Sequence, residues 1–374
     1  GNTLSLSVTL LALLGLGSCL VWLGWQATPI RAATINVDDG AGAVDFPGCG
    51  SVGSPCRTIP YAVDNIAVSG DVVYVWDGTY IEPVTMKAGV VISGAGSAVT
   101  FIDGENVRGP MITANSAAVN SSAILRGFTI RRGYATDGAA VSISANASPI
   151  VESCIISDNL ATNNGGGLYV DGSVTLRETQ IISNTADQYG GGLYQIGTGG
   201  RVTVTGGLVE RNTATQVDGG GLYVNGSAIL TGTEVFTNTA GRSGGGLWIN
   251  FDTVLTNTQV ISNTAGRWGG GLYQNDFVSS ITAVNTRLDR NRLTWPDSRC
   301  GGLFASAANT ELQTVEITNN RSDLYGGGLF VAISAFLTDT HVTDNTTGSR
   351  GGGLCQNTAS GWLEISKARS SETQ

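Results

Sequence analysis

The sequence predicts an all-β protein, a single-stranded right-handed parallel β-helix with a short N-terminal capping helix. Three features of the 374-residue chain predict this fold. A glycine triplet followed by Leu recurs, an Asn precedes most triplets by six or seven residues, and a branched apolar residue stands three positions before each Asn. Self-similarity with a period of roughly 20 to 50 residues is typical of solenoids.

The positions of these residues define the repeat. The triplets begin at Gly165, Gly190, Gly219, Gly244, Gly269, Gly326 and Gly351, and in an eighth copy Cys300 replaces the first Gly. Successive starts lie 25, 29, 25, 25, 31, 26 and 25 residues apart. The Asn positions are Asn159, Asn184, Asn212, Asn238, Asn263, Asn291, Asn320 and Asn345. The apolar positions are Ile156, Ile181, Val209, Val235, Val260, Leu288, Ile317 and Val342.

The composition of each repeat favours strands over helices. Three adjacent glycines together with Thr, Val and Asn disfavour helix, while short β-branched runs beside turn residues favour strands. Stacked coils of about 25 residues would pair each strand in parallel with its copy about 4.8 Å away. Because one coil cannot bury its apolar face alone, only a stack of coils would form a core.

The same residues carry a resemblance to a known family. The Gly-Gly-Gly-Leu-Tyr and Ile/Val-x-x-Asn pairs resemble the GGAI and FxxN repeats of polymorphic outer membrane proteins. Here Gly-Leu replaces Ala-Ile, and Ile or Val usually replaces Phe. More widely, residues 138–365 resemble bacterial right-handed β-helix surface proteins of the pectate-lyase-like superfold. This resemblance implies the β-helix fold and says little about function.

The first 32 residues are expected to direct export. The apolar run Leu4–Trp25 indicates a signal peptide cleaved after Ala32. Two alternatives remain, namely an uncleaved membrane anchor and a lipobox that would lipidate Cys19. The segment lacks a basic start, so we expect the upstream end to be truncated. All three interpretations place the rest of the protein outside the cell or at its surface, with any membrane contact made only through this segment.

Four further regions follow the leader. Residues 33–70 are predicted to form an N-terminal cap with a short helix, because Ile59, Ala62, Val63 and Ile66 have helical spacing. Residues 71–137 are predicted to form irregular first coils, and residues 138–365 the regular repeats. Residues 366–374 form a polar tail, where we expect the array to be cut in mid-coil. The helix should cover the open end of the stack, because an exposed strand edge invites aggregation.

The charge of the chain argues against one class of partner, and its cysteines indicate one disulfide. The formal charge is −9 with no basic run of residues, which argues against nucleic acid as a partner.

Cys49 and Cys56 lie seven residues apart in a loop and are expected to form a disulfide in an exported chain. The other cysteines beyond the leader, namely Cys154, Cys300 and Cys355, are expected to fill core or turn positions. We expect no metal site and no cofactor. The Asp38-Asp39-Gly40 run would allow calcium but lacks the spaced ligands of a calcium loop.

Stacking turns repeated positions into columns. The Leu after each triplet should point inward, and the Asn residues should take left-handed backbone conformations and link their amides from coil to coil. Alternation along the strand would then turn the residue after Leu outward. These outward residues are Tyr169, Tyr194, Tyr223, Trp248, Tyr273, Phe304 and Phe330.

Two interpretations of this aromatic column remain open. The rings could stack on one another and stiffen the array, or they could form a platform for sugar rings, with Gln195, Asn225, Asn250 and Gln274 as polar edges. If the rings are exposed, Trp248→Ala should weaken glycan retention and leave the melting temperature nearly unchanged. If the rings are buried, the same change should instead lower the free energy of unfolding by about 3–5 kcal/mol. The column would then be structural.

No catalytic constellation is evident from the sequence. Asp187, Asp218 and Asp323 recur near the glycine bend at different offsets, and Arg242, Arg267 and Arg350 recur there without an obvious acidic partner column. We therefore favour an exported, surface-exposed repeat protein with a non-catalytic adhesion, glycan-binding or cell-envelope role. Its partner would be a polysaccharide or another surface protein. The alternatives are a polysaccharide lyase or glycoside hydrolase acting on an extracellular polysaccharide, and a purely structural array.

Overall fold

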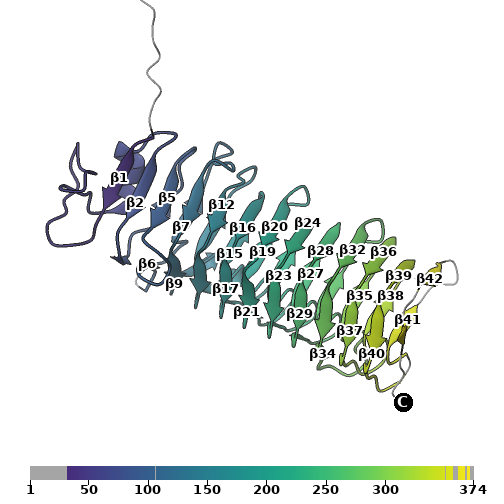
Figure 1. Cartoon of the computed structure of the whole chain (residues 1–374). Coiled ribbons are helices and arrows are strands. Elements are labelled where there is room, and N and C mark those ends of the chain that lie inside the picture. The colour runs from purple at the N-terminus through teal and green to yellow at the C-terminus, as the bar shows by residue number, and fades with distance from the viewer. Residues whose placement is uncertain (1–31, 106, 350, 357–360, 367–368, 371–374) are drawn as a thin grey trace, which may run out of the picture. The chain divides into compact units, whose positions relative to one another are not determined.

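The chain folds as a right-handed parallel β-helix, drawn in Figure 1 as a stack of similar coils. The computed structural model describes residues 32–105, 107–349, 351–356, 361–366 and 369–370. The expected leader, including Cys19, and most of the polar tail lie outside these residues. No helix in the described part of the chain has the length and apolar character needed to span a bilayer.

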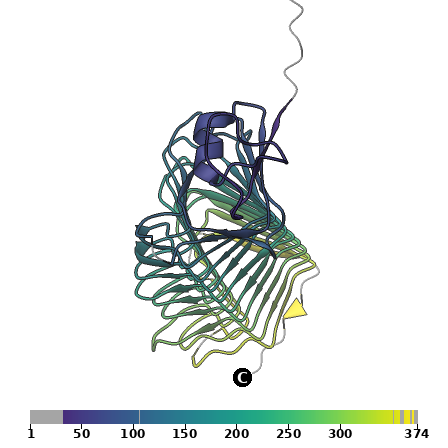
Figure 2. The same cartoon turned by 90° about the vertical axis from the view of Figure 1, so that its left-hand side faces the viewer.

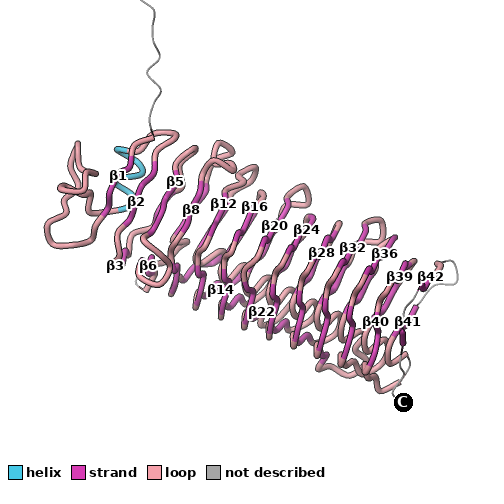
Figure 3. Tube along the Cα trace, in the orientation of Figure 1, coloured by secondary structure: helices cyan, strands magenta, loops and turns pink. Residues whose placement is uncertain are grey.

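Each regular coil contributes one strand to each of four parallel sheets, here numbered I to IV in the order in which the chain visits them (Figure 3). Sheet III begins only at β10 and ends at β34, so the coils before and after these strands have no strand in it. The predicted fold class is therefore confirmed, with up to four strands per coil.

Sheet I contains β1 (Thr34–Val37), β2 (Val72–Val75), β5 (Val91–Gly94), β8 (Ile124–Arg126), β12 (Ile150–Glu152), β16 (Val174–Arg177), β20 (Arg201–Thr205), β24 (Ser227–Thr231), β28 (Thr253–Thr256), β32 (Ser280–Val284), β36 (Asn309–Gln313), β39 (Ala335–Thr338) and β42 (Leu363–Ser366). Sheet II contains β3 (Gly78–Tyr80), β6 (Thr100–Asp103), β9 (Thr129–Arg131), β13 (Ile155–Ser157), β17 (Gln180–Ile182), β21 (Leu208–Glu210), β25 (Glu234–Phe236), β29 (Gln259–Ile261), β33 (Arg287–Asp289), β37 (Glu316–Thr318), β40 (His341–Thr343) and β43 (Arg369–Ser370).

Sheet III contains β10 (Tyr134–Asp137), β14 (Leu160–Asn164), β18 (Thr185–Ala186), β22 (Thr213–Ala214), β26 (Thr239–Ala240), β30 (Thr264–Ala265) and β34 (Arg292–Leu293). Sheet IV contains β4 (Val84–Thr85), β7 (Ile112–Ala114), β11 (Val141–Ile143), β15 (Leu168–Val170), β19 (Leu193–Gln195), β23 (Leu222–Val224), β27 (Leu247–Ile249), β31 (Leu272–Gln274), β35 (Leu303–Ala305), β38 (Leu329–Val331) and β41 (Leu354–Gln356).

Coils pair residue for residue, so each repeated position forms a column. In sheet IV, Leu168 pairs with Leu193, which pairs with Leu222. The Leu residues from Leu168 to Leu329 are buried inside the coils, which confirms the predicted leucine ladder. Each fully buried Leu side chain stabilises the fold by about 1.5–3 kcal/mol relative to exposure.

The Asn residues form a buried amide ladder at the corner between sheets II and III. The backbone N–H and Nδ2 of Asn238 both donate to Oδ1 of Asn263, at 2.9 and 3.0 Å, and Nδ2 also donates to the carbonyl of Val209 at 2.8 Å. The same pattern links every Asn from Asn159 to Asn345. The predicted ladder is confirmed.

One detail of the predicted bend is wrong. The left-handed backbone belongs to the residue before each Asn, for example Ser183 (φ 56°) and Thr237 (φ 51°), and not to the Asn itself. The reason is geometric, because the amide must turn inward to reach the coils above and below. The residue before it then makes the corner.

The glycine triplet makes the corner between sheets III and IV. Gly190 has a φ of +62°, which favours glycine over other residues. A Cβ on Gly191 would lie 2.5 Å from the carbonyl oxygen of Gly220 in the next coil. The triplet therefore permits a tight turn and the close stacking of backbones. Cys300 fills the first-glycine position with a φ of 64° and is buried.

The N-terminal end of the stack carries the short helix, which faces the viewer in Figure 2. It consists of α1 (Ile59–Tyr61) and the wider η1 (Ala62–Ile66). The Thr58 hydroxyl caps it by accepting the N–H of Tyr61 at 3.3 Å, and Ile59, Ala62 and Val63 are buried. Lys87 Nζ binds the carbonyl of Ala67 just past its end at 2.7 Å.

The segment before the helix belongs to the first sheet. Strand β1 pairs in parallel with β2, so residues 34–37 extend sheet I. The following loop contains a disulfide between Cys49 and Cys56, whose Cα atoms lie 4.9 Å apart. Cys56 N donates to the carbonyl of Asn36 at 2.9 Å, which ties this loop to β1.

Candidate functional site

The aromatic residues after the Leu ladder lie in one column on sheet IV. The strands β15, β19, β23, β27, β31, β35 and β38 pair them in register from Tyr169 to Phe330. Successive ring centroids are 4.1 to 6.2 Å apart, and Tyr223 stacks on Trp248 with an interplanar angle of 4°. Cys355 takes the next place after Phe330.

The expected exposure of these rings is wrong for three of them. The side chains point away from the Leu ladder, yet Trp248, Tyr273 and Phe330 are only 8%, 9% and 3% exposed. Alternation fixes the direction of a side chain and does not decide what covers it. A sugar platform on Trp248 therefore lacks the exposed ring face it requires. For the half-buried Tyr169, Tyr194, Tyr223 and Phe304, a ligand role stays a prediction.

A second row of rings, which the sequence interpretation missed, provides part of this cover. The residue immediately before the glycine triplet is Tyr189 in one coil, Trp268 in another and Tyr325 in a third. Tyr189 contacts Tyr223 edge-on at 5.0 Å, and Trp268 stacks on Tyr273 at 5.8 Å. The recurrence of aromatic residues at this position was the available signal.

Arginines extend the second row. The Arg267 guanidinium lies 4.5 Å from the Trp268 ring centroid, and that of Arg299 lies 5.4 Å from Tyr325. Such cation–π contacts add about 0.5–1 kcal/mol at exposed sites. Of the two other arginines named from sequence, Arg242 is described below and Arg350 lies outside the described residues.

Burial keeps the column neutral. It raises the pKa of Tyr194 and of Tyr273 to about 12 and raises the pKa of Tyr223 as well. A phenolate within the stack would lose its hydration, so the ionised form is disfavoured.

The predicted polar edges divide into two groups. Gln195 and Gln274 are fully buried, because the residue after an outward aromatic points inward. Gln195 binds the backbone of Gly197 and accepts the N–H of Gly226 at 2.7 Å. Asn225 and Asn250 lie one residue further on and form a half-buried amide row, with 3.0 Å between Nδ2 of Asn250 and Oδ1 of Asn225. Sugar contacts from Gln195 and Gln274 are therefore ruled out.

Three buried carboxylates are bound by arginines. Arg242 Nε donates to Asp218 of the preceding coil at 3.0 Å, so this Arg has the acidic partner that the sequence did not reveal. Asp103 accepts from Arg131 and Arg132 at 2.9 and 2.8 Å. Burial tends to raise the pKa of Asp103, but these arginine hydrogen bonds outweigh it and the pKa lies below its usual value.

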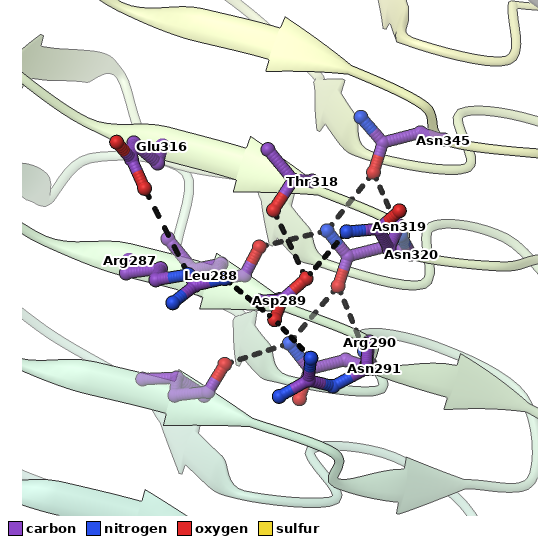
Figure 4. Close-up of polar contacts among 11 residues, drawn as sticks. Arg287, Leu288, Asp289, Arg290, Asn291, Glu316, Thr318, Asn319, Asn320 and Asn345 are labelled. Carbon is purple, nitrogen blue, oxygen red and sulfur yellow. Dashed lines mark hydrogen bonds and ion pairs between the residues drawn. The ribbon is translucent and has the colours of Figure 1, made fainter.

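The third carboxylate, Asp289, lies beside the amide ladder (Figure 4). It accepts from Thr318 Oγ1 at 3.0 Å and Asn319 Nδ2 at 2.9 Å, and it pairs with Arg287 at 3.0 Å and Arg290 at 3.2 Å. These four partners occupy its lone pairs. Like Asp103 and Asp218, it therefore stabilises the junction between adjacent coils.

The corner between sheets I and II is hollowed over seven consecutive coils. One hollow of about 620 Å³ spans the bends at Glu178, Gly206 and Gly232, and a second of about 400 Å³ spans those at Asn257, Asn285, Thr314 and Asp339. These bend residues have positive φ. A buried Thr often follows, as where Thr258 Oγ1 donates to the carbonyl of Leu230 at 3.2 Å. We call the two hollows together the corner groove.

The second half of the corner groove holds the chain's only histidine. His341 pairs in register with Glu316 on the neighbouring strand, and Arg287 Nε lies 3.8 Å from Glu316. Asp339 lines the same hollow. Among the residues that the structure describes, no group of three or more His, Cys, Asp or Glu is arranged to hold a metal ion.

The remaining cysteines are not joined to one another. Cys154 and Cys300 are buried and Cys355 is half-buried. Burial raises the pKa of Cys154 to about 12 and also raises that of Cys300. Thiols held in the neutral form are poor nucleophiles and poor metal ligands.

Comparison with known protein families agrees with the repeat. Residues 153–171 match the model of the Chlamydia polymorphic membrane protein repeat. The chain matches no curated protein. A pectin methylesterase structure from Erwinia chrysanthemi is 11% identical with a TM-score of 0.42, covering 67% of this chain and 88% of that one. A rhamnogalacturonan lyase structure is 14% identical with a TM-score of 0.42, covering 91% of this chain and 87% of that one.

Proposed function

We propose that this chain is an exported, surface-exposed repeat protein that binds an extended polysaccharide without catalysing a reaction on it. The repeat match supports a location at the outer membrane or cell surface. The disulfide between Cys49 and Cys56 supports export, because such bonds persist in oxidising compartments.

The corner groove is the observation that carries the binding proposal. It presents amide, hydroxyl and charged side chains over seven coils, including Gln180, Gln259, Arg287 and Glu316. Coils about 4.8 Å apart would place one such groove side chain at each regular interval, although its type varies from coil to coil. An extended, hydroxyl-rich polymer could bind several coils at once, and weak contacts within one ligand reinforce one another.

The non-catalytic part of the proposal is supported by the ionic partners of the buried acids. Asp103, Asp218 and Asp289 are each bound by at least one arginine. A carboxylate whose lone pairs are occupied by protein donors is poorly placed to act as a general base.

Binding can be tested by filling the groove. Gln259 is half-buried at its centre, and Gln259→Trp should lower the affinity for a bound polysaccharide about tenfold or more in affinity electrophoresis. Ile196→Trp is the matched control, because Ile196 is exposed in the loop after β19, outside the groove residues. Equal binding by the two variants would remove the groove from the proposal. A wild-type protein that retains no polysaccharide would overturn the function itself.

One observation favours an enzyme as the second candidate. Glu316 and His341 emerge side by side from β37 and β40, and Arg287 and Asp339 line the same hollow. Adjacent carboxylate and imidazole groups suit general acid–base chemistry on a glycosidic bond. Release of new reducing ends or unsaturated products by the wild type, lost in Glu316→Gln and His341→Asn, would replace the non-catalytic proposal with a lyase or hydrolase.

A further inference from the structure

A single coil carries an enlarged loop with an exposed indole. Nine residues separate Asn291 from Cys300, whereas six or seven separate the ladder Asn from the triplet elsewhere. The added length follows β34 and includes Trp295, whose side chain is 47% exposed. Trp295 belongs to neither of the two stacked rows of rings, so its exposure needs an explanation.

The loop holds the indole in a defined place. The backbone N–H groups of Thr294 and Trp295 donate to the carbonyls of Ala265 and Gly266 in the preceding coil, at 3.0 and 2.9 Å. Asp297 N donates to Asp323 of the following coil at 3.2 Å. Hydrogen bonds to the coils on both sides therefore fix the loop that carries the ring.

The indole rests on a glycine. A Cβ on Gly266 would lie 2.9 Å from Cε2 and 3.0 Å from Nε1 of Trp295. Only a residue without a side chain allows the ring to approach the backbone this closely. The Cε2–Nε1 edge of the indole thus lies against the coil, while about half of the side chain is open to solvent.

Two arginines share a hollow with this indole. The hollow has a volume of about 440 Å³ and is lined by Arg292, Arg321, Asp323 and Trp295 among others. Arg292 and Arg321 are bridge partners on neighbouring coils. Arg292 Nε donates only to the hydroxyl of Thr264, at 3.2 Å, and within the described residues the Arg321 guanidinium has no hydrogen-bond or ion-pair partner.

Arg292 and Arg321 line this hollow without the carboxylate partners that hold the arginines of the buried ion pairs. Arg131, Arg132, Arg242 and Arg287 are each paired with a carboxylate. The hollow is lined by two arginines and one aspartate, on a chain whose formal charge is −9. A local positive site on an acidic protein suits an anionic group of the ligand, and guanidinium binds carboxylate in a planar, two-point geometry.

We infer that this hollow binds an acidic sugar residue of the polysaccharide, a uronic acid. The apolar C–H face of the sugar lies on the exposed indole of Trp295, and its carboxylate lies between Arg292 and Arg321. An open aromatic face beside a few convergent polar groups is the usual composition of a small-ligand site. The inference rests on the proposed polysaccharide-binding function and adds a second subsite and a ligand class to it.

The test compares oligogalacturonate with its methyl ester, which keeps the sugar faces and removes the charge. Isothermal titration calorimetry should show that the wild type binds the acid about tenfold more tightly than the ester, as expected for a charge-assisted contact. Arg292→Gln combined with Arg321→Gln should abolish this preference, so that the acid and the ester bind with equal affinity. Trp295→Ala should weaken both ligands.

Trp362→Ala is the matched control, because Trp362 is 46% exposed and lies on another part of the solenoid. It should bind both oligomers like the wild type. If the wild type binds the acid but Trp295→Ala binds it equally well, the site is wrong and the polysaccharide-binding function stands. If the arginine variant keeps the preference for the acid, the uronate assignment is wrong. If the wild type binds neither these oligomers nor any polysaccharide in electrophoresis, the proposed function fails as well.

Discussion

Replacing Asn238 with Ala would remove one rung from the middle of the amide ladder. The Oδ1 atom of Asn238 accepts two hydrogen bonds from Asn212, one from its backbone N–H at 2.9 Å and one from the Nδ2 of Asn212 at 3.0 Å. Both donors are buried and would lose these acceptors. Asn263 Oδ1 would keep the backbone N–H of residue 238 as a donor.

The expected cost follows from the donors left unsatisfied. Each buried unpaired group costs about 1–3 kcal/mol, so two donors predict a loss of about 4 kcal/mol in the free energy of unfolding. The matched control is Asn275→Ala. Nδ2 of the half-buried Asn275 donates to Oδ1 of Asn250 at 3.1 Å, and its Oδ1 accepts from the Tyr273 hydroxyl at 3.1 Å. Water can replace these partners, so the control should cost about 1 kcal/mol.

Urea unfolding followed by circular dichroism would measure the difference between the two variants. Repeat arrays are stabilised by nearest-neighbour contacts, so hydrogen exchange should also accelerate in the coils that contain Asn212 and Asn263 before the distant coils. Equal unfolding midpoints for the two variants would refute the reasoning. So would exchange that accelerates evenly along the chain.

Three further outcomes follow from the structure. Trp248→Ala should lower the free energy of unfolding by about 3–5 kcal/mol in urea titrations, because the ring is buried and stacked; an unchanged midpoint would contradict this. Burial raises the pKa of Tyr194 and Tyr273 from 10.0 to about 12, so the unfolded state ionises first, and the stability present below pH 10 should be lost as the pH rises towards 12. The double variant with Phe at both positions should lose less stability over that range, and an equal loss would count against the argument. Removing the disulfide with Cys49→Ala and Cys56→Ala should cost about 2.5 kcal/mol in thermal unfolding, and no change would disprove its role.

The structure could be predicted from the sequence wherever one repeat position holds the same residue type in every coil. The Leu and Asn columns follow directly from the 25-residue spacing, because in-register stacking converts a repeat into a ladder. The sequence was insufficient where two different positions meet. Tyr273 is buried against Trp268, which holds a different position in the repeat, and Asp218 meets Arg242 from the next coil at a different offset from its triplet.

The candidate sites were harder to predict for the same reason. The corner groove is assembled from seven coils whose residues differ in type, so no motif recurs along it. The site at Trp295 depends on a change in loop length, which interrupts the repeat. Both sites consist of departures from periodicity, whereas the interpretation of the sequence followed what was periodic.

The amide ladder also bears on how the solenoid would respond to tension. Each regular coil is held to its neighbours by parallel strands and one Asn rung. Pulled from one end along the axis, the coils would peel away in sequence. The 25 residues from Asn238 to Asn263 would lengthen by about 80 Å when extended. At a cell surface, such a chain would act as an extensible tether that yields in nearly equal steps.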